Sequence, residues 1–263
     1  MQHRGVVTSV LCAALSVALM QPLRAQGTQV RPEIGIEEHL GTLLPLDVEL
    51  YDEQGHLTAL RKVITKPTIV TFVYFRCPGI CSPLLTELSR VVDNISLVLG
   101  TDYQIVTISF DPRETPDLAA SKKESYLGAL RHKVDPAGWR WFTGDSVAIH
   151  RLTDAAGFYF KRDGEDFVHA GALIVLSREG KVTRYINGIQ YLPFDVKMAV
   201  VEAAEGRTGP TIAKLLAFCY RYDPEARTYA LNVTRVSGIV IVALAAIFVI
   251  VFVRRPRKVT AER

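Results

Sequence analysis

The sequence contains no glycine-rich phosphate loop, no internal repeat and no excess of basic residues in its central part. The missing loop argues against nucleotide binding, and the missing repeat excludes solenoid and collagen-like folds. The net charge is +4, but residues 254–263 alone supply +4 and residues 1–25 supply +2, so the remainder carries −2. This slightly acidic body excludes the basic surface that nucleic-acid binding requires.

Apolar segments lie near both ends of the chain. Residues 1–25 have a short basic start, an apolar stretch and a small final residue, which is typical of a cleaved signal peptide; an uncleaved anchor is the alternative. Residues 236–253 carry no charge and would span roughly 27 Å as a helix, enough to cross a bilayer. Because the basic tail, residues 254–263, follows directly, we expect a single-pass helix with a cytoplasmic C-terminus. The main domain would then lie in the periplasm, anchored to a bacterial inner membrane.

Cysteine is scarce. Removal of a signal peptide would take away Cys12 and leave Cys77, Cys81 and Cys219. An odd number of cysteines argues against a simple disulfide framework. Cys219 is either a packing residue near the membrane or an auxiliary thiol that exchanges with Cys77 or Cys81.

Strand and helix patterns alternate through the body, where the 49% of hydrophobic residues in the chain provide ample core. Residues 67–75 form a continuous apolar, β-branched run that predicts a strand buried on both faces. Residues 81–99 place their apolar side chains on one helical stripe. We therefore predict an α/β domain over residues 37–205, with a central mixed sheet flanked by helices. A flexible entry segment, residues 26–36, precedes it, and a connector, residues 206–235, follows. The other expected elements are strands 103–110, 139–143, 172–176 and 182–186 and helices 115–130, 145–156 and 195–204.

Cys77 and Cys81 lie where the first buried strand meets its helix. Free backbone N–H groups and the positive end of the helix dipole favour a thiolate there. We therefore expect at least one of the two cysteines to ionise more easily than a free cysteine. Three intervening residues let both sulfurs face one point, as either a redox pair or a metal site. A structural disulfide or a buried pair is the alternative.

His169 and Asp111 are candidates to join this site. His169 lies in a turn before strand 172–176, and it faces the cysteines if that strand pairs near strand 67–75. Two thiolates and one imidazole suit copper, whereas a structural zinc site usually has four protein ligands. A purely structural histidine is the alternative. Asp111 ends the second strand at the same edge of the sheet, where it could orient the imidazole, accept thiol protons or cap the next helix.

Three stretches form a specific combination: F-V-Y-F-R-C-P-G-I-C at residues 72–81, S-F-D-P-R-E-T-P at residues 109–116, and the turn at His169. Together they resemble the Sco/SenC family of copper-binding thioredoxin-like proteins over residues 35–205. The resemblance implies a thioredoxin-like fold and copper, as Cu(I) or Cu(II), bound by Cys77, Cys81 and His169. It also implies a role at the binuclear copper site of cytochrome c oxidase subunit 2.

Three functional hypotheses follow. The leading one is a membrane-tethered, extracytoplasmic copper metallochaperone that serves cytochrome c oxidase subunit 2 or another copper acceptor. The second is a thiol–disulfide oxidoreductase that reduces the acceptor's cysteines and is itself restored by a thiol–disulfide reductant. The third is a redox sensor or a peroxidase-like protein. Thioredoxins carry a proline in the loop facing the redox pair, and the absence of a proline beside His169 favours the copper hypothesis.

Overall fold

The structure is a computed structural model. It describes residues 33–209, residues 220–223 and 228–231, and five helical residues from Ser237 to Phe248. No helix within these described residues is long and apolar enough to cross a membrane. The expected signal peptide, the basic tail, Cys219 and most of the expected span at residues 236–253 lie outside them.

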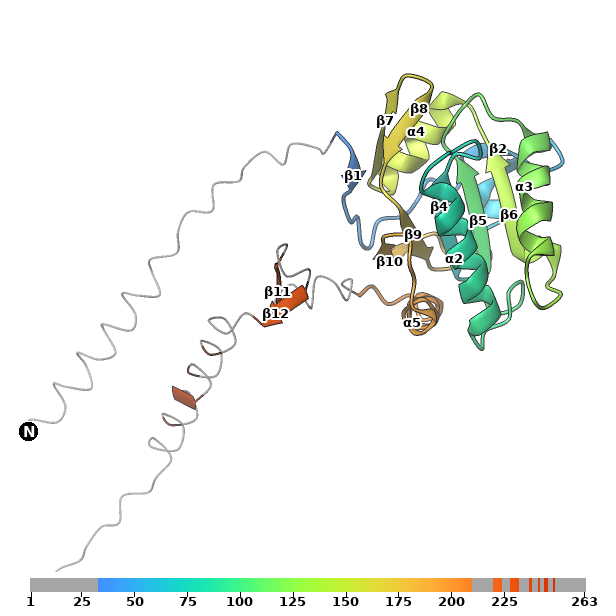
Figure 1. Cartoon of the computed structure of the whole chain (residues 1–263). Coiled ribbons are helices and arrows are strands. Elements are labelled where there is room, and N and C mark those ends of the chain that lie inside the picture. The colour runs from blue at the N-terminus through green and yellow to red at the C-terminus, as the bar shows by residue number, and fades with distance from the viewer. Residues whose placement is uncertain are drawn as a thin grey trace, which may run out of the picture. The chain divides into compact units, whose positions relative to one another are not determined.

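A mixed sheet of seven strands forms the centre of the domain (Figure 1), in the order β10-β9-β4-β5-β6-β2-β3. The neighbours β4 (Thr68–Val73), β5 (Gln104–Ser109) and β6 (Trp139–Thr143) run parallel to one another. β9 (Ala172–Leu176) joins β4 in the antiparallel direction, which confirms the expected mixed sheet. Every residue of β4, β5 and β9 is buried, and for β4 this confirms the predicted strand buried on both faces. The outer strands are β10 (Val182–Asn187), β2 (Glu49–Asp52) and β3 (Leu57–Ala59).

Helices pack on the sheet, and α2 (Cys81–Asn94) does so through the apolar stripe that the sequence predicts. α2 contacts both α3 (Pro116–Gly128) and α5 (Pro193–Ala204), and in Figure 1 α2 and α3 lie in front of the parallel strands. α4 (Ser146–Ala155) packs against β7 (Phe158–Asp163). It begins as predicted, because the Asp145 side chain accepts a hydrogen bond from the Ala148 N–H at 2.8 Å. Two short 3₁₀ helices, Leu60–Lys62 and Pro136–Gly138, complete the helical elements of the described domain.

α2 ends five residues earlier than the expected boundary at residue 99. Ile95 is already extended, and the Asp102 carboxylate accepts the Val98 N–H at 2.7 Å. Continuation of the helix would need the Val98 N–H for a backbone hydrogen bond, but the Asp102 side chain binds this group and stabilises a turn instead.

A second sheet, which the sequence analysis did not predict, carries one of the candidate site residues. It has the order β1-β7-β8, with β1 (Gly35–Ile36), β7 (Phe158–Asp163) and β8 (Asp166–His169). β7 and β8 form a hairpin whose turn includes Gly164 at φ +63°. His169 therefore ends a strand instead of lying in a turn. β1 comes from the end of the expected entry segment. A separate hairpin, β11 (Tyr220–Asp223) with β12 (Thr228–Leu231), lies within the expected connector.

Candidate metal centre

The two cysteines occupy the loop and helix that follow β4. Cys81 is the first residue of α2 and is only 2% exposed, whereas Cys77 lies in the preceding loop and is half-buried. The loop turns tightly, since the Cys77 N–H donates to the Tyr74 carbonyl oxygen at 3.2 Å. The Gly79 N–H donates to the Cys77 sulfur at 3.4 Å. Both cysteines are free thiols in the structure, so it contains no Cys77–Cys81 disulfide.

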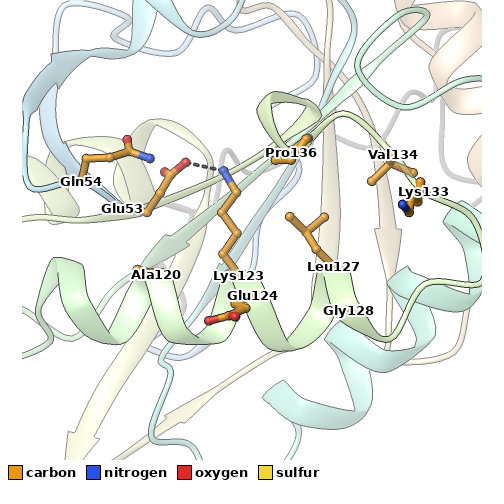
Figure 2. A pocket seen from close by; sticks show the side chains of 10 residues that line it. All are labelled: Glu53, Gln54, Ala120, Lys123, Glu124, Leu127, Gly128, Lys133, Val134 and Pro136. Carbon is orange, nitrogen blue, oxygen red and sulfur yellow. Dashed lines mark hydrogen bonds and ion pairs between the residues drawn. The ribbon is translucent and has the colours of Figure 1, made fainter.

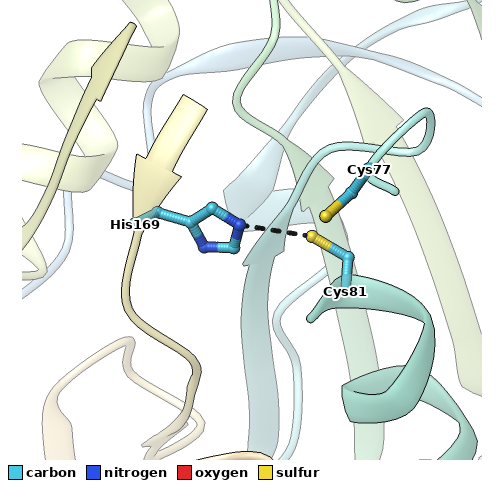
Figure 3. A group of neighbouring side chains, drawn as sticks. All are labelled: Cys77, Cys81 and His169. Carbon is cyan, nitrogen blue, oxygen red and sulfur yellow. Dashed lines mark hydrogen bonds between the residues drawn. The ribbon is translucent and has the colours of Figure 1, made fainter. Parts of the chain in front are cut away.

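His169 reaches the cysteines because the strand after it, β9, pairs with β4 as expected. Its Nε2 lies 3.4 Å from the Cys81 sulfur. The two sulfurs and a ring nitrogen of His169 all lie within 4.8 Å of one another, and Figure 3 shows the three side chains converging on one point. The structure thus brings together the three residues that the sequence analysis selected.

The environment of His169 fixes which ring nitrogen is available. Nδ1 lies 2.9 Å from the Ala170 carbonyl oxygen, which can only accept a hydrogen bond. Nδ1 therefore carries the proton, and Nε2 keeps its lone pair toward Cys81 when the ring is neutral. Burial lowers the pKa of His169 below its ordinary value, although the Ala170 hydrogen bond partly opposes this effect. The ring is thus held in the neutral form that a metal ligand requires.

Cys81 is not the cysteine that ionises more easily than a free one. Burial raises the pKa of the Cys81 thiol far above its ordinary value, and the nearby Cys77 adds to this shift. A hydrogen bond from the Tyr74 backbone opposes the shift without cancelling it. The helix N-terminus favours a thiolate, but removal of the sulfur from water outweighs it. Without a cation, Cys81 is therefore a protonated thiol that can donate to His169 Nε2.

Aromatic rings surround the imidazole on its inner side. The ring centroids of Phe110, Tyr74 and Phe158 lie 5.0, 5.8 and 6.2 Å from that of His169. On the outer side, Pro78 and Gly79 are exposed beside Cys77. The site therefore has a dry inner wall and an open outer face.

Asp111 occupies the expected edge of the sheet but has a different partner. Its two carboxylate oxygens accept hydrogen bonds from the Arg113 guanidinium at 2.8 and 2.9 Å. The backbone carbonyl of Ala170, and not Asp111, bonds the imidazole Nδ1. Although burial opposes the shift, the Arg113 hydrogen bonds keep the pKa of Asp111 below its ordinary value.

Glu114 contributes to the site in a way that the sequence analysis missed. Its carboxylate accepts the N–H groups of Phe75 and Arg76 at 2.7 and 2.8 Å, immediately before Cys77. It also accepts the Ser109 hydroxyl at 2.6 Å and is only 5% exposed. Burial raises the pKa of Glu114 above its ordinary value. The available signal was an acidic residue just after β5, but nothing in the sequence distinguished its role from that of Asp111.

A cavity of about 610 Å³ lies elsewhere, between α3 and the turn after β2 (Figure 2). Lys123 forms an ion pair with Glu53 there. None of the residues that line it belongs to the Cys-Cys-His group. The chemistry of the three converging ligands is therefore separate from this cavity.

Comparisons with known proteins agree with the architecture. The SCO1/SenC family model matches residues 42–203. A Stutzerimonas stutzeri protein described as copper-binding is 27% identical over 146 residues, which cover 53% of this chain and 67% of that protein. The crystal structure of a candidate electron transfer protein from Aquifex aeolicus VF5 matches with a TM-score of 0.57 at 29% identity, covering 64% of this chain and 95% of that one. Arabidopsis thaliana ScoI with copper bound matches with a TM-score of 0.50 at 21% identity, covering 64% and 99%. The described domain has the mixed α/β, thioredoxin-like fold of these structures.

Proposed function

Because the chain belongs to the SCO1/SenC family, we propose that it is a copper metallochaperone that holds its cargo between Cys77, Cys81 and His169. The observation that carries the proposal is the convergence of two thiols and one imidazole nitrogen within 4.8 Å. Sulfur and imidazole ligands suit copper, and three ligands fall short of the four that structural zinc sites use. The copper-bound Arabidopsis relative and the copper-binding Stutzerimonas relative support this assignment.

The protonation states give each ligand a defined part in binding. His169 needs no proton loss, because its neutral ring already directs Nε2 toward Cys81. Cys81 must lose its proton when the metal arrives, so binding releases protons to solvent. The exposed Pro78 and Gly79 leave Cys77 accessible from outside, so that an acceptor's ligands can replace those of the chaperone one at a time.

We propose subunit 2 of cytochrome c oxidase, or another extracytoplasmic copper protein, as the acceptor. A structural relative, BsSco, is described as a member of the Sco family of cytochrome c oxidase assembly proteins, which supports this class of partner. The signal-like residues 1–25 and the uncharged residues 236–253 support a periplasmic domain tethered to an inner membrane. A tether would keep the carrier close to a membrane-embedded acceptor.

A second candidate function, reduction of an acceptor disulfide, is favoured by the two adjacent free thiols. The Cys77 thiolate would attack the partner disulfide and release one partner thiolate. Cys81 would then attack the Cys77 sulfur, release the second partner thiolate and form the Cys77–Cys81 disulfide. Two electrons pass to the partner, and a separate thiol reductant must restore the pair.

Copper titration of the reduced protein tests the proposal. We expect one copper per chain in the wild type and weaker binding in His169→Ala. His150→Ala is the matched control, because His150 is exposed and stacks on Phe160 of the same hairpin at 5.3 Å without facing the thiols. The proposal is wrong if the wild type binds no copper, or if both variants bind it equally well. Full oxidase assembly in cells carrying His169→Ala would favour thiol reduction over copper delivery.

A further inference from the structure

The loop between β5 and α3, residues 111–114, contacts both halves of the candidate copper site. One half is the loop that carries Cys77 and leads into α2, and the other is the β7–β8 hairpin that carries His169. These halves are far apart in the sequence and belong to different sheets. A segment that binds both can therefore determine how far the imidazole lies from the sulfurs.

Glu114 attaches this loop to the cysteine half. Its two carboxylate oxygens accept the consecutive N–H groups of Phe75 and Arg76. The carboxylate lies at the end of β5 and is itself held by the Ser109 hydroxyl. The backbone leading into Cys77 is thus fixed to the neighbouring parallel strand.

Arg113 attaches the same loop to the histidine half. Its Nη1 donates to the Glu165 carboxylate at 2.7 Å, and its Nη2 donates to the Glu165 backbone carbonyl oxygen at 2.8 Å. The guanidinium carbon also lies 5.7 Å from the centroid of the Phe167 ring. Glu165 lies in the hairpin turn, and His169 is at the far end of the four-residue strand β8. All four residues of β8 pair with β7, from Asp166 at the turn to His169, so a shift at the turn is transmitted along the hairpin to the imidazole.

We infer that Arg113 is a positioning residue that holds the His169 hairpin at the correct distance from Cys77 and Cys81. The inference rests on the proposed role of these three residues as copper ligands. It gives Asp111 a defined part as well, since its nearly fully buried carboxylate holds the guanidinium through two parallel hydrogen bonds. Asp111 acts on the imidazole indirectly, through Arg113 and the hairpin.

Only an arginine fits these contacts. The planar guanidinium binds the Asp111 carboxylate with one edge while its remaining N–H groups bind Glu165. A lysine could neutralise Asp111 but could not present this fork to both partners. Arg113→Lys therefore separates the two effects, because the buried charge keeps a partner while the attachment to the hairpin is lost. The hairpin keeps its packing of Phe160 and Phe167 against Phe110, so the domain should remain folded.

The test compares Arg113→Lys with wild type, with and without copper. In the metal-free protein, nitrogen NMR of the His169 ring should show a shifted Nε2 signal, because Nε2 loses its contact with the Cys81 sulfur. With copper, Cu(II) affinity should fall about tenfold, since outer residues that orient metal-binding histidines cost roughly that much. The loss for Cu(I) should be smaller, because two thiolates still bind it. Arg162→Lys is the matched control: Arg162 lies on the same hairpin, 3.6 Å from Glu165, and no hydrogen bond or ion pair in the structure joins it to Asp111 or Glu114.

Unchanged ring nitrogens and unchanged Cu(II) affinity in Arg113→Lys would overturn the inference, as would an equal effect of Arg162→Lys. If Arg113→Lys does not fold, Asp111→Asn combined with Arg113→Gln removes the charge pair together and must give the same changes. Absence of copper binding in the wild type would refute the proposed function, and the metal-free NMR comparison would still decide the positioning role.

Discussion

Replacement of Glu114 by glutamine tests whether a buried carboxylate shapes the approach to Cys77. The Oε2 atom accepts two donors, the Phe75 N–H and the Ser109 hydroxyl, and Oε1 accepts the Arg76 N–H. The amide oxygen of glutamine can replace only one of these atoms. With its oxygen at the Oε2 position, the glutamine NH₂ group faces the Arg76 N–H, so two donors oppose each other.

The size of the effect follows from these contacts. Loss of one hydrogen bond to a charged acceptor costs about 1.5–3 kcal/mol. Part of this is recovered, because burial raises the pKa of Glu114 and glutamine avoids burying a charge. We expect Glu114→Gln to lower the free energy of unfolding by about 1–2 kcal/mol, or roughly 2–4 °C in Tm for each kcal/mol. The freed Arg76 backbone should also make Cys77 react faster with an alkylating reagent.

Denaturant unfolding and the alkylation rate of the reduced protein measure the two effects. Glu124→Gln is the control, because Glu124 is exposed on α3 and its loss should change stability by less than about 0.5 kcal/mol. An unfolding midpoint, slope and alkylation rate equal to those of the wild type would show that Glu114 does not anchor the cysteine loop.

Three further predictions follow from the same contacts. Gly157→Ala should destabilise the domain by about 2–4 kcal/mol in denaturant unfolding, because its Cβ would lie 1.9 Å from the Glu37 carbonyl oxygen at φ +62°. Gly164→Ala, at φ +63° with open space around it, should cost only about 1 kcal/mol, and equal losses would contradict the steric argument. Asp111 has a pKa lowered in the folded state, so its stabilisation is present above the ordinary value of 3.8 and is lost as pH falls below it. Thermal melts of Asp111→Asn should therefore depend less on acidic pH than those of the wild type. Oxidation of Cys77 and Cys81 to a disulfide should abolish copper binding, and a thiol reductant should restore it; retention of bound metal after oxidation would argue against thiolate ligands.

The central sheet could be predicted because its strands are continuous apolar runs. Residues 68–73 carry no charged side chain, and their four apolar residues and two β-branched threonines are all buried, which matches a strand covered on both faces. The β7–β8 hairpin was missed because its outer half is charged, with Lys161, Arg162 and Asp163 exposed. An Asp-Gly pair at residues 163–164 was the available turn signal.

The three candidate ligands could be predicted from the sequence, whereas the contacts that support them could not. Cys77, Cys81 and His169 are chemically distinctive and lie at predictable points beside two paired strands. The partner of Asp111 could not be predicted, because Arg113 takes its position from the hairpin turn that the sequence pattern did not reveal. The raised pKa of Cys81 could not be predicted, because helix position is visible in the sequence, whereas the extent of burial depends on the whole packed core.

The protonation state of Cys81 also bears on which chemistry the site performs. A buried thiol with a raised pKa is a poor nucleophile at neutral pH, because only the thiolate attacks a disulfide. A monovalent copper ion held by Cys77, Cys81 and His169 would change this balance, since its charge would offset one of the two thiolates and leave a site of low net charge beside the aromatic wall. His169 adds no charge, as its neutral ring is stabilised by burial. The same burial that slows disulfide exchange at Cys81 therefore favours a soft cation as the species that deprotonates it. This argument supports the proposed copper carriage over the alternative of rapid thiol exchange.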